Sequence, residues 1–303
     1  MLRGELAHGD VVIATARPVL RHLLASGDQA LFSDEVLARV RGMGVHVARQ
    51  MLMALAAKAD VSDRGAFVEE RTEPIAVSLL NDPAILAHAH SLAIEAQIAD
   101  RLHRRSGIDP VLSPLVQNQA ASDDHGIAAA AMHVLSAQAR FMQQQRRMEL
   151  PLVEMPAELV EIALDTLRMH NDDLPEETGQ VHSELVSMIR PEASRIGQMT
   201  ALVSAMKHRA MRALEVDNAG VAIFATALSM AAGQPRDVVL LSFGENQCAR
   251  LAVSLRAAGL GQSAVEEQFL YLHPEIELPD GFEMLRTDRA NALLATAQSG
   301  GGQ

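Results

Sequence analysis

LAHAHSLAIEAQIADRLHRR, residues 86–105, puts apolar side chains on two sides of a predicted helix. At 3.6 residues per turn, Leu92 and Ala96 share one face, whereas Ile98 and Leu102 lie on a second face. A helix that is apolar on two sides is held between neighbouring helices rather than against one layer. The stretch therefore predicts a stack of helices.

The polar side chains of this stretch are confined to two narrow edges. His88 and His90 are two residues apart and point to opposite edges, whereas two ligands on one helix need a spacing of three or four. We interpret the edges as a solvated helix surface. If the stretch has a further role, we predict it at the edge formed by His90, Gln97 and Arg101, which would contact a partner or an anion.

The composition favours helix throughout the 303 residues. Aromatic residues make up 3% of the chain, with no Trp and one Tyr, and strong helix formers fill most of the remainder. Helix start and stop signals recur often enough for about a dozen helices. DVVLLSF (237–243) is the one run whose periodicity does not decide between helix and strand. The sequence predicts an all-α protein.

A weak internal repeat bears on how the helices are arranged. DPAILAHAHSLA (82–93) is echoed by DPVLSPLVQNQA (109–120), which favours a HEAT-like stack, although an irregular bundle has the same helix content. Two prolines in MELPLVEMP mark an internal boundary. We therefore predict an N-terminal helical-repeat-like subdomain (1–150), a compact acidic helical C-terminal subdomain (151–298) and a disordered tail (299–303).

Proline is common at the first position of a helix, so several prolines of the chain indicate where helices begin. On this basis new helices should begin at Pro74, at Pro110 and at Pro191, the last running to about Val216. A final helix is predicted over 282–297.

Charge is unevenly distributed along the chain, whose net charge is −12. There are 15 Lys/Arg and 17 Asp/Glu residues up to Leu150, a net −2, but 11 and 21 beyond it, a net −10. An acidic C-terminal half repels phosphate groups. We therefore expect neither nucleic acid nor membrane as a partner, and, since the N-terminus lacks a signal-peptide pattern, a cytoplasmic protein.

Motifs that carry catalysis are not evident. Cys248 is the sole cysteine and is interpreted as a buried, inert thiol. Glu5-x-x-His8 is the only E-x-x-H, whereas a di-iron bundle needs two. Gly42-Met43-Gly44 follows no strand and lacks the third glycine of a dinucleotide fingerprint. We predict no catalytic residue, no metal ligand and no cofactor.

Two further segments contain residues of the types that bind metal ions or DNA, but their patterns do not favour either kind of site. The acidic loop 171–179, with flanking histidines, lacks the ligand order of a calcium loop and is interpreted as solvated. The short helices predicted over 235–272 carry Arg236, Arg250 and Arg256 but more carboxylates, which argues against a DNA-reading unit.

Fifteen methionines are many for a chain with so few aromatic residues. Met199 and Met206 are seven residues apart, beside Leu202, which is the spacing of a core stripe. We interpret the methionines mainly as core filling, with an exposed methionine-lined groove for a helical or extended peptide as the alternative.

Two stretches resemble an uncharacterised alphaproteobacterial family, domain of unknown function 2336. They are QARFMQQQRRMELPLVEMPAELVEIAL (138–164) and FATALSMAAGQPRDVVLLSFGENQCARLAVSLRAAGLGQSAVEEQFLYLHPE (224–275). The first stretch has the family's order of polar helix, Leu-Pro elbow and new helix. The second has its order of apolar helix, Gly-x-Pro turn, short helix and "RAAGL" turn. Together the two stretches cover about a quarter of the chain. The resemblance implies an all-α fold and transfers no catalytic residue.

These observations favour a non-catalytic cytoplasmic module for protein–protein interaction or regulation, with a protein partner. The alternative is a small-molecule sensor or an unrecognised enzyme with a pocket between the two subdomains. A homodimer formed through an apolar helical face is a third hypothesis.

Overall fold

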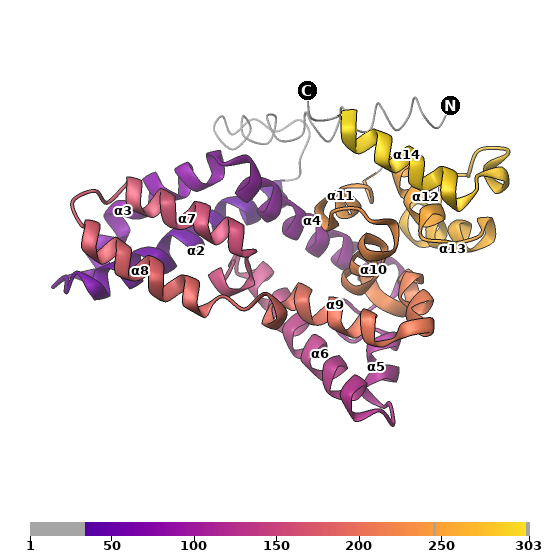
Figure 1. Ribbon diagram of the computed structural model, residues 1–303, viewed down its shortest axis with the longest axis horizontal. Coiled ribbons are helices and arrows are strands. Elements are labelled where there is room, and N and C mark those ends of the chain that lie inside the picture. The colour runs from indigo at the N-terminus through magenta and orange to yellow at the C-terminus, as the bar shows by residue number, and fades with distance from the viewer. Residues whose placement is uncertain (1–33, 245–246, 301–303) are drawn as a thin grey trace. The chain divides into compact units, whose positions relative to one another are not determined.

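The computed structural model describes residues 34–244 and 247–300. Every regular element in these ranges is helical, so the predicted all-α class is confirmed, and DVVLLSF begins within a helix (Figure 1). The α-helices are α2 (Asp34–Lys58), α3 (Arg64–Asn81), α4 (Pro83–Ser106), α5 (Pro114–Ala120), α6 (His125–Arg146), α7 (Ala157–Met169), α8 (Pro175–Met188), α9 (Arg195–Ala205), α10 (Val216–Ala232), α11 (Arg236–Leu241), α12 (Cys248–Ala257), α13 (Gln262–Leu272) and α14 (Thr287–Gly300). The 3₁₀ helices are η1 (Leu152–Glu154), η2 (Pro191–Ala193), η3 (Lys207–Leu214) and η5 (Phe282–Met284).

Tertiary contacts divide the chain into two compact units. Unit 1 contains the described residues in 94–139 and 198–300, and unit 2 contains 34–93 and 140–197. This division differs from the boundary predicted after residue 150, because the chain around Leu150 packs on α2 of its own unit. The His46 and Gln50 side chains both contact the Leu150 backbone, and Gln50 Nε2 donates to its carbonyl at 2.8 Å. The HEAT-like arrangement stays a prediction.

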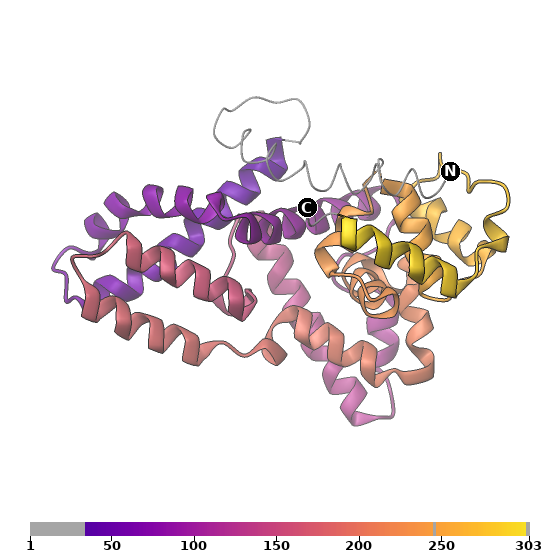
Figure 2. The same cartoon turned by 45° about the horizontal axis from the view of Figure 1, so that its top comes forward.

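In unit 2, α2 packs against α3, α7 and α8 (Figures 1 and 2). Gly42 and Gly44 permit close approach on this helix. A Cβ atom added at Gly42 would lie 2.4 Å from the Cβ of Met148, and one at Gly44 would lie 2.9 Å from the Leu80 side chain. The helix is continuous through both glycines. Because a side chain at either position would clash with a neighbour, their role is close packing rather than phosphate binding.

The core of unit 1 surrounds α10, which contacts α5, α11, α12, α13 and η3. Its fully buried Phe224 lies 5.6 Å, centroid to centroid, from Phe243. The helix ends at Gly233, which has the left-handed conformation at φ 61°. Because α10 is apolar and buried on most sides, the short helices of unit 1 pack around it.

Three predicted elements are wrong in detail. Pro74 lies inside α3 and starts no new helix, so the chain tolerates the lost backbone hydrogen bond there. Pro110 stands in a turn in which Asp109 accepts from two following N–H groups, and α5 begins at Pro114. The helix predicted from Pro191 to Val216 is broken into η2, α9 and η3.

The C-terminal end also differs from the prediction. The final helix, α14, begins at Thr287, later than predicted, because η5 occupies 282–284. It continues to Gly300, so the first part of the predicted tail is helical, and 301–303 lie outside the described residues.

Candidate functional site

The predicted partner edge on α4 is largely withdrawn from solvent. His90, in unit 2, is 5% exposed, and burial lowers its pKa to about 4. Gln97 and Arg101, in unit 1, are half-buried. Two guanidinium nitrogens of Arg101, Nε and Nη2, are buried without an acceptor among the described residues. The edge as a contact for a partner or anion stays a prediction.

The other edge of this helix was interpreted as solvated, and the structure corrects that interpretation. Glu95 is completely buried, and Arg236 Nη1 donates to its Oε2 at 2.9 Å. The same guanidinium donates to Thr226 Oγ1 and to the carbonyl of Ala222. The stretch thus carries a structural ion pair of unit 1, because an isolated buried charge would be strongly unfavourable.

A polar groove of about 500 Å³ lies within unit 1 and was not predicted. One wall is the connection between α5 and α6, and the other is the junction of α9 with η3. The lining residues are Asn118, Gln119, Ala121, Ser122, Asp123, Asp124 and Ile127 on the first wall and Ala205, Met206, Lys207, His208 and Arg209 on the second. Its volume is within the range of ligand-binding sites.

The second wall of the groove presents three consecutive basic residues, Lys207, His208 and Arg209. All three are exposed. Within the described part of the chain, their side chains make no hydrogen bond or ion pair. The signal was present in the sequence as KHR, a basic run within the acidic C-terminal half. It was missed because it lies in the middle of a predicted helix.

Lys207 has an unusual backbone conformation, with φ 52°. The left-handed region costs a residue with a Cβ about 1–2 kcal/mol, and such outliers gather at binding sites. Here the outlier ends α9 and begins η3. Met206, which is 3% exposed, anchors the turn in the core immediately before it.

The first wall of the groove is built by helix capping. Asp124 Oδ1 accepts from the N–H groups of Gly126 and Ile127, which fixes the start of α6. Ser122 Oγ in turn accepts from the N–H of Asp124. Asp123 therefore lies in a connection that is ordered by local hydrogen bonds, and Asn118 and Gln119 lie in the last turn of α5.

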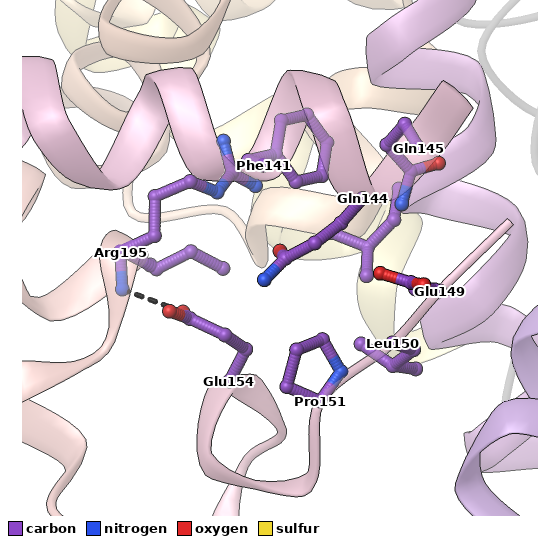
Figure 3. A pocket seen from close by; sticks show the side chains of 10 residues that line it. Phe141, Gln144, Gln145, Glu149, Leu150, Pro151, Glu154 and Arg195 are labelled. Carbon is purple, nitrogen blue, oxygen red and sulfur yellow. Dashed lines mark hydrogen bonds between the residues drawn. The ribbon is translucent and has the colours of Figure 1, made fainter. Parts of the chain in front are cut away.

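A second, smaller hollow lies within unit 2 (Figure 3). Arg195, 3% exposed, has its guanidinium carbon 3.6 Å from the centroid of the Phe141 ring. Its backbone N–H donates to Glu154 Oε2 at 2.8 Å, and Gln144 points toward the connector that carries Pro151 and Glu154. The free interior is about 10 Å³, roughly the room for one water molecule. This hollow is a packing feature, since it is too small for an organic ligand.

The acidic loop and its neighbours are engaged in exposed ion pairs. Arg71 Nη2 lies 3.2 Å from Asp173 Oδ2, and His182 Nε2 lies 2.7 Å from Glu161 Oε2. Within 34–244 and 247–300, no three His, Cys, Asp or Glu side chains gather in a geometry suited to a metal ion. Glu5 and His8 lie outside the described residues.

The other candidate side chains, those of the cysteine and of the arginines on the short helices, make contacts within the protein. Cys248 is half-buried and packs against the unit 1 core, so it is less buried than predicted. Of the arginines on the short helices, Arg236 pairs with Glu95, Arg250 is 3% exposed, and Arg256 donates to two backbone carbonyls. These arginine side chains therefore interact with or are buried among other residues of unit 1.

Methionine side chains are exposed more often than the core interpretation predicts. Met199 and Met206 are buried, as expected of a core stripe. Eight others are between 37% and 79% exposed: Met53, Met132, Met148, Met169, Met188, Met211, Met230 and Met284. The methionines thus fall into a core set and a surface set.

Among the described residues, no single helix combines the length and apolar character needed to cross a membrane, although the bent pair of η3 and α10 meets that requirement by length and composition only.

Compared with models of known protein families, with curated proteins and with solved structures, the chain gives no match. The resemblance to domain of unknown function 2336 therefore stays a prediction.

Proposed function

We propose that the chain is a non-catalytic module for protein–protein interaction or regulation, working in the cytoplasm. The observation that supports this function is the set of eight exposed methionines. Met169 is 70% exposed and Met284 is 79% exposed. Apolar side chains presented to water are stabilised when a partner covers them, by about 25 cal/mol for each Å² of apolar surface removed from water.

Methionine suits this role because its unbranched, polarisable side chain adapts to partner surfaces of different shape. Surfaces rich in methionine are typical of proteins that bind several helical or extended segments. In unit 2, Met53, Met169 and Met188 come from α2, α7 and α8, which pack on one another. Each of the three is exposed, and they are the contacts of unit 2 that we expect to contribute most.

The test uses the immobilised full chain to capture proteins from native lysate at low and moderate salt. Glutamine replaces methionine with little change in length or helix propensity, so the test variant is Met53→Gln, Met169→Gln and Met188→Gln together. The matched control changes three exposed carboxylates of α3: Glu69→Gln, Glu70→Gln and Glu73→Gln.

We expect one reproducible partner that persists at moderate salt, because apolar contacts are not screened by ions. Its recovery should fall at least about fivefold, roughly 1 kcal/mol, with the methionine variant and stay unchanged with the control. No reproducible partner at either salt, or equal recovery with both variants, contradicts the proposal.

Two narrower expectations belong to the same proposal. We propose membership of the family that the turn patterns resemble, and a homodimer as one form of the interaction. Light scattering of the purified chain tests the dimer, since a monomer at high protein concentration excludes it.

A further inference from the structure

We propose that the groove of unit 1 binds a short acidic peptide segment, whose carboxylates are held by Lys207, His208 and Arg209. This site is separate from the exposed methionines of unit 2, so either proposal can fail while the other stands. The occupant would be an extended stretch of a partner protein that carries consecutive Asp or Glu residues.

The cations of the groove are available for a ligand. Lys58 and Arg71 each have a carboxylate partner, since Lys58 lies 2.6 Å from Glu184 and Arg71 lies 3.2 Å from Asp173. Lys58 and Lys207 are the two lysines of the chain, and among described residues the second has no such carboxylate. Lys207 and Arg209, two adjacent cations unmatched among the described residues, attract a carboxylate in this acidic protein, and the imidazole of His208 between them offers an N–H donor.

The backbone of the basic wall is held in place. The left-handed Lys207 turns the chain sharply between α9 and η3, and the buried Met206 fixes the turn to the core. The basic side chains therefore start from a positioned backbone, which reduces the ordering cost of binding.

The opposite wall of the groove offers hydrogen-bonding groups for a peptide backbone. The primary amides of Asn118 and Gln119 each offer two donors and one acceptor oxygen, which match the N–H and C=O groups of an extended peptide backbone. Asp123 and Asp124 add two negative charges at the same wall, and Asp124 Oδ1 already accepts from the N–H groups of Gly126 and Ile127. A polyphosphate backbone, which is charged at every unit, would meet repulsion there, whereas a peptide can turn its backbone N–H groups toward Asp123 and its carboxylates toward the basic wall. The two walls together favour a peptide over a nucleic acid.

The experiment titrates the full chain with fluorescein-labelled, terminally blocked tetraglutamate at low salt and follows fluorescence anisotropy. Tetralysine of the same design and a single-stranded oligonucleotide are the comparison probes. The test variant is Lys207→Gly with Arg209→Ser, because glycine accepts the left-handed backbone without strain. The matched control is Arg104→Ser with Arg105→Ser, two exposed arginines of unit 1 that do not line the groove.

We expect saturable binding of tetraglutamate that weakens at least tenfold in the groove variant and less than twofold in the control. Asp123→Asn should strengthen binding of the same probe. Amide hydrogen exchange should slow on binding over 118–124 and 205–209. Equal loss in groove and control variants, preference for the oligonucleotide, or no saturable binding of tetraglutamate overturns the proposal. Because the methionine variant leaves this groove intact, it should bind tetraglutamate as the unmodified chain does.

Discussion

Arg236 of α11 and Glu95 of α4, which are 141 residues apart in the chain, form a buried ion pair at 2.9 Å within unit 1. The Glu95 side chain is 1% exposed and that of Arg236 is 12% exposed. This pair ties the opening sequence stretch to the C-terminal helices, and it accounts for a charged residue on a helix face that water does not reach.

Removing the cation of this pair should destabilise the fold. Arg236→Met leaves the Glu95 carboxylate buried without its main counter-charge, and such a loss typically costs about 3–5 kcal/mol. The double variant Glu95→Leu with Arg236→Met should recover a large part of this loss, because no charge is then buried. Urea denaturation of both variants measures the difference, and equal stabilities would refute the interpretation.

Gly42→Ala should destabilise unit 2 despite the higher helix propensity of alanine. The new Cβ would approach the Met148 Cβ to 2.4 Å, and overpacking of this kind costs about 1–3 kcal/mol. Gly179→Ala is the control, since that glycine lies in α8 with open space around it. We expect the control to be neutral or to gain about 0.5–1 kcal/mol from propensity. Thermal unfolding of the two variants gives the comparison.

The stability of the protein should depend on pH through the protonation of the buried His90. Its folded pKa of about 4 is below the ordinary value of 6.5, so between these values the unfolded chain binds the extra proton. Stability from this group is therefore fully present above about pH 6.5 and is lost as the pH falls toward 4, with a total of roughly 3 kcal/mol.

A pH series of urea unfolding between 4 and 7.5 tests this dependence. His90→Asn should flatten the curve in that window, whereas His103→Gln, at an exposed position of the same helix, should leave its slope unchanged. A steeper curve for His90→Asn would count against the burial argument.

Strain at Lys207 leads to a prediction that is independent of peptide binding. Lys207→Gly should stabilise the protein by up to about 1 kcal/mol relative to Lys207→Ala, since glycine has no Cβ to resist φ 52°. The reverse order of stabilities would show that the left-handed turn is not retained in solution.

Local signals predicted most helices, and long-range relationships explain what they missed. The Asp124 cap and the Gly233 stop act within a few residues, so their effects are readable from the sequence. The ion pair of Glu95 joins positions far apart in the chain, and no spacing rule predicts it. Pro74 was expected to start a helix, but packing of α3 on α2 outweighs the lost hydrogen bond.

The candidate groove was beyond sequence reasoning for a similar reason. KHR at 207–209 looks like part of one continuous helix in the sequence. Its importance depends on the break at Lys207 and on the distant wall at Asn118 and Gln119. The exposed methionines were weighed only as an alternative to core filling, because composition does not tell which methionines reach the surface.

Under the proposed function, the exposed methionines contact a protein partner. The most direct measurement replaces methionine in growing cells with a photo-activatable analogue and maps cross-linked peptides after illumination. We expect cross-links to one partner from exposed positions such as Met53, Met169 and Met188, and none from the buried Met43. Cross-links confined to peptides of this same monomer, or spread over unrelated proteins without preference, would contradict it.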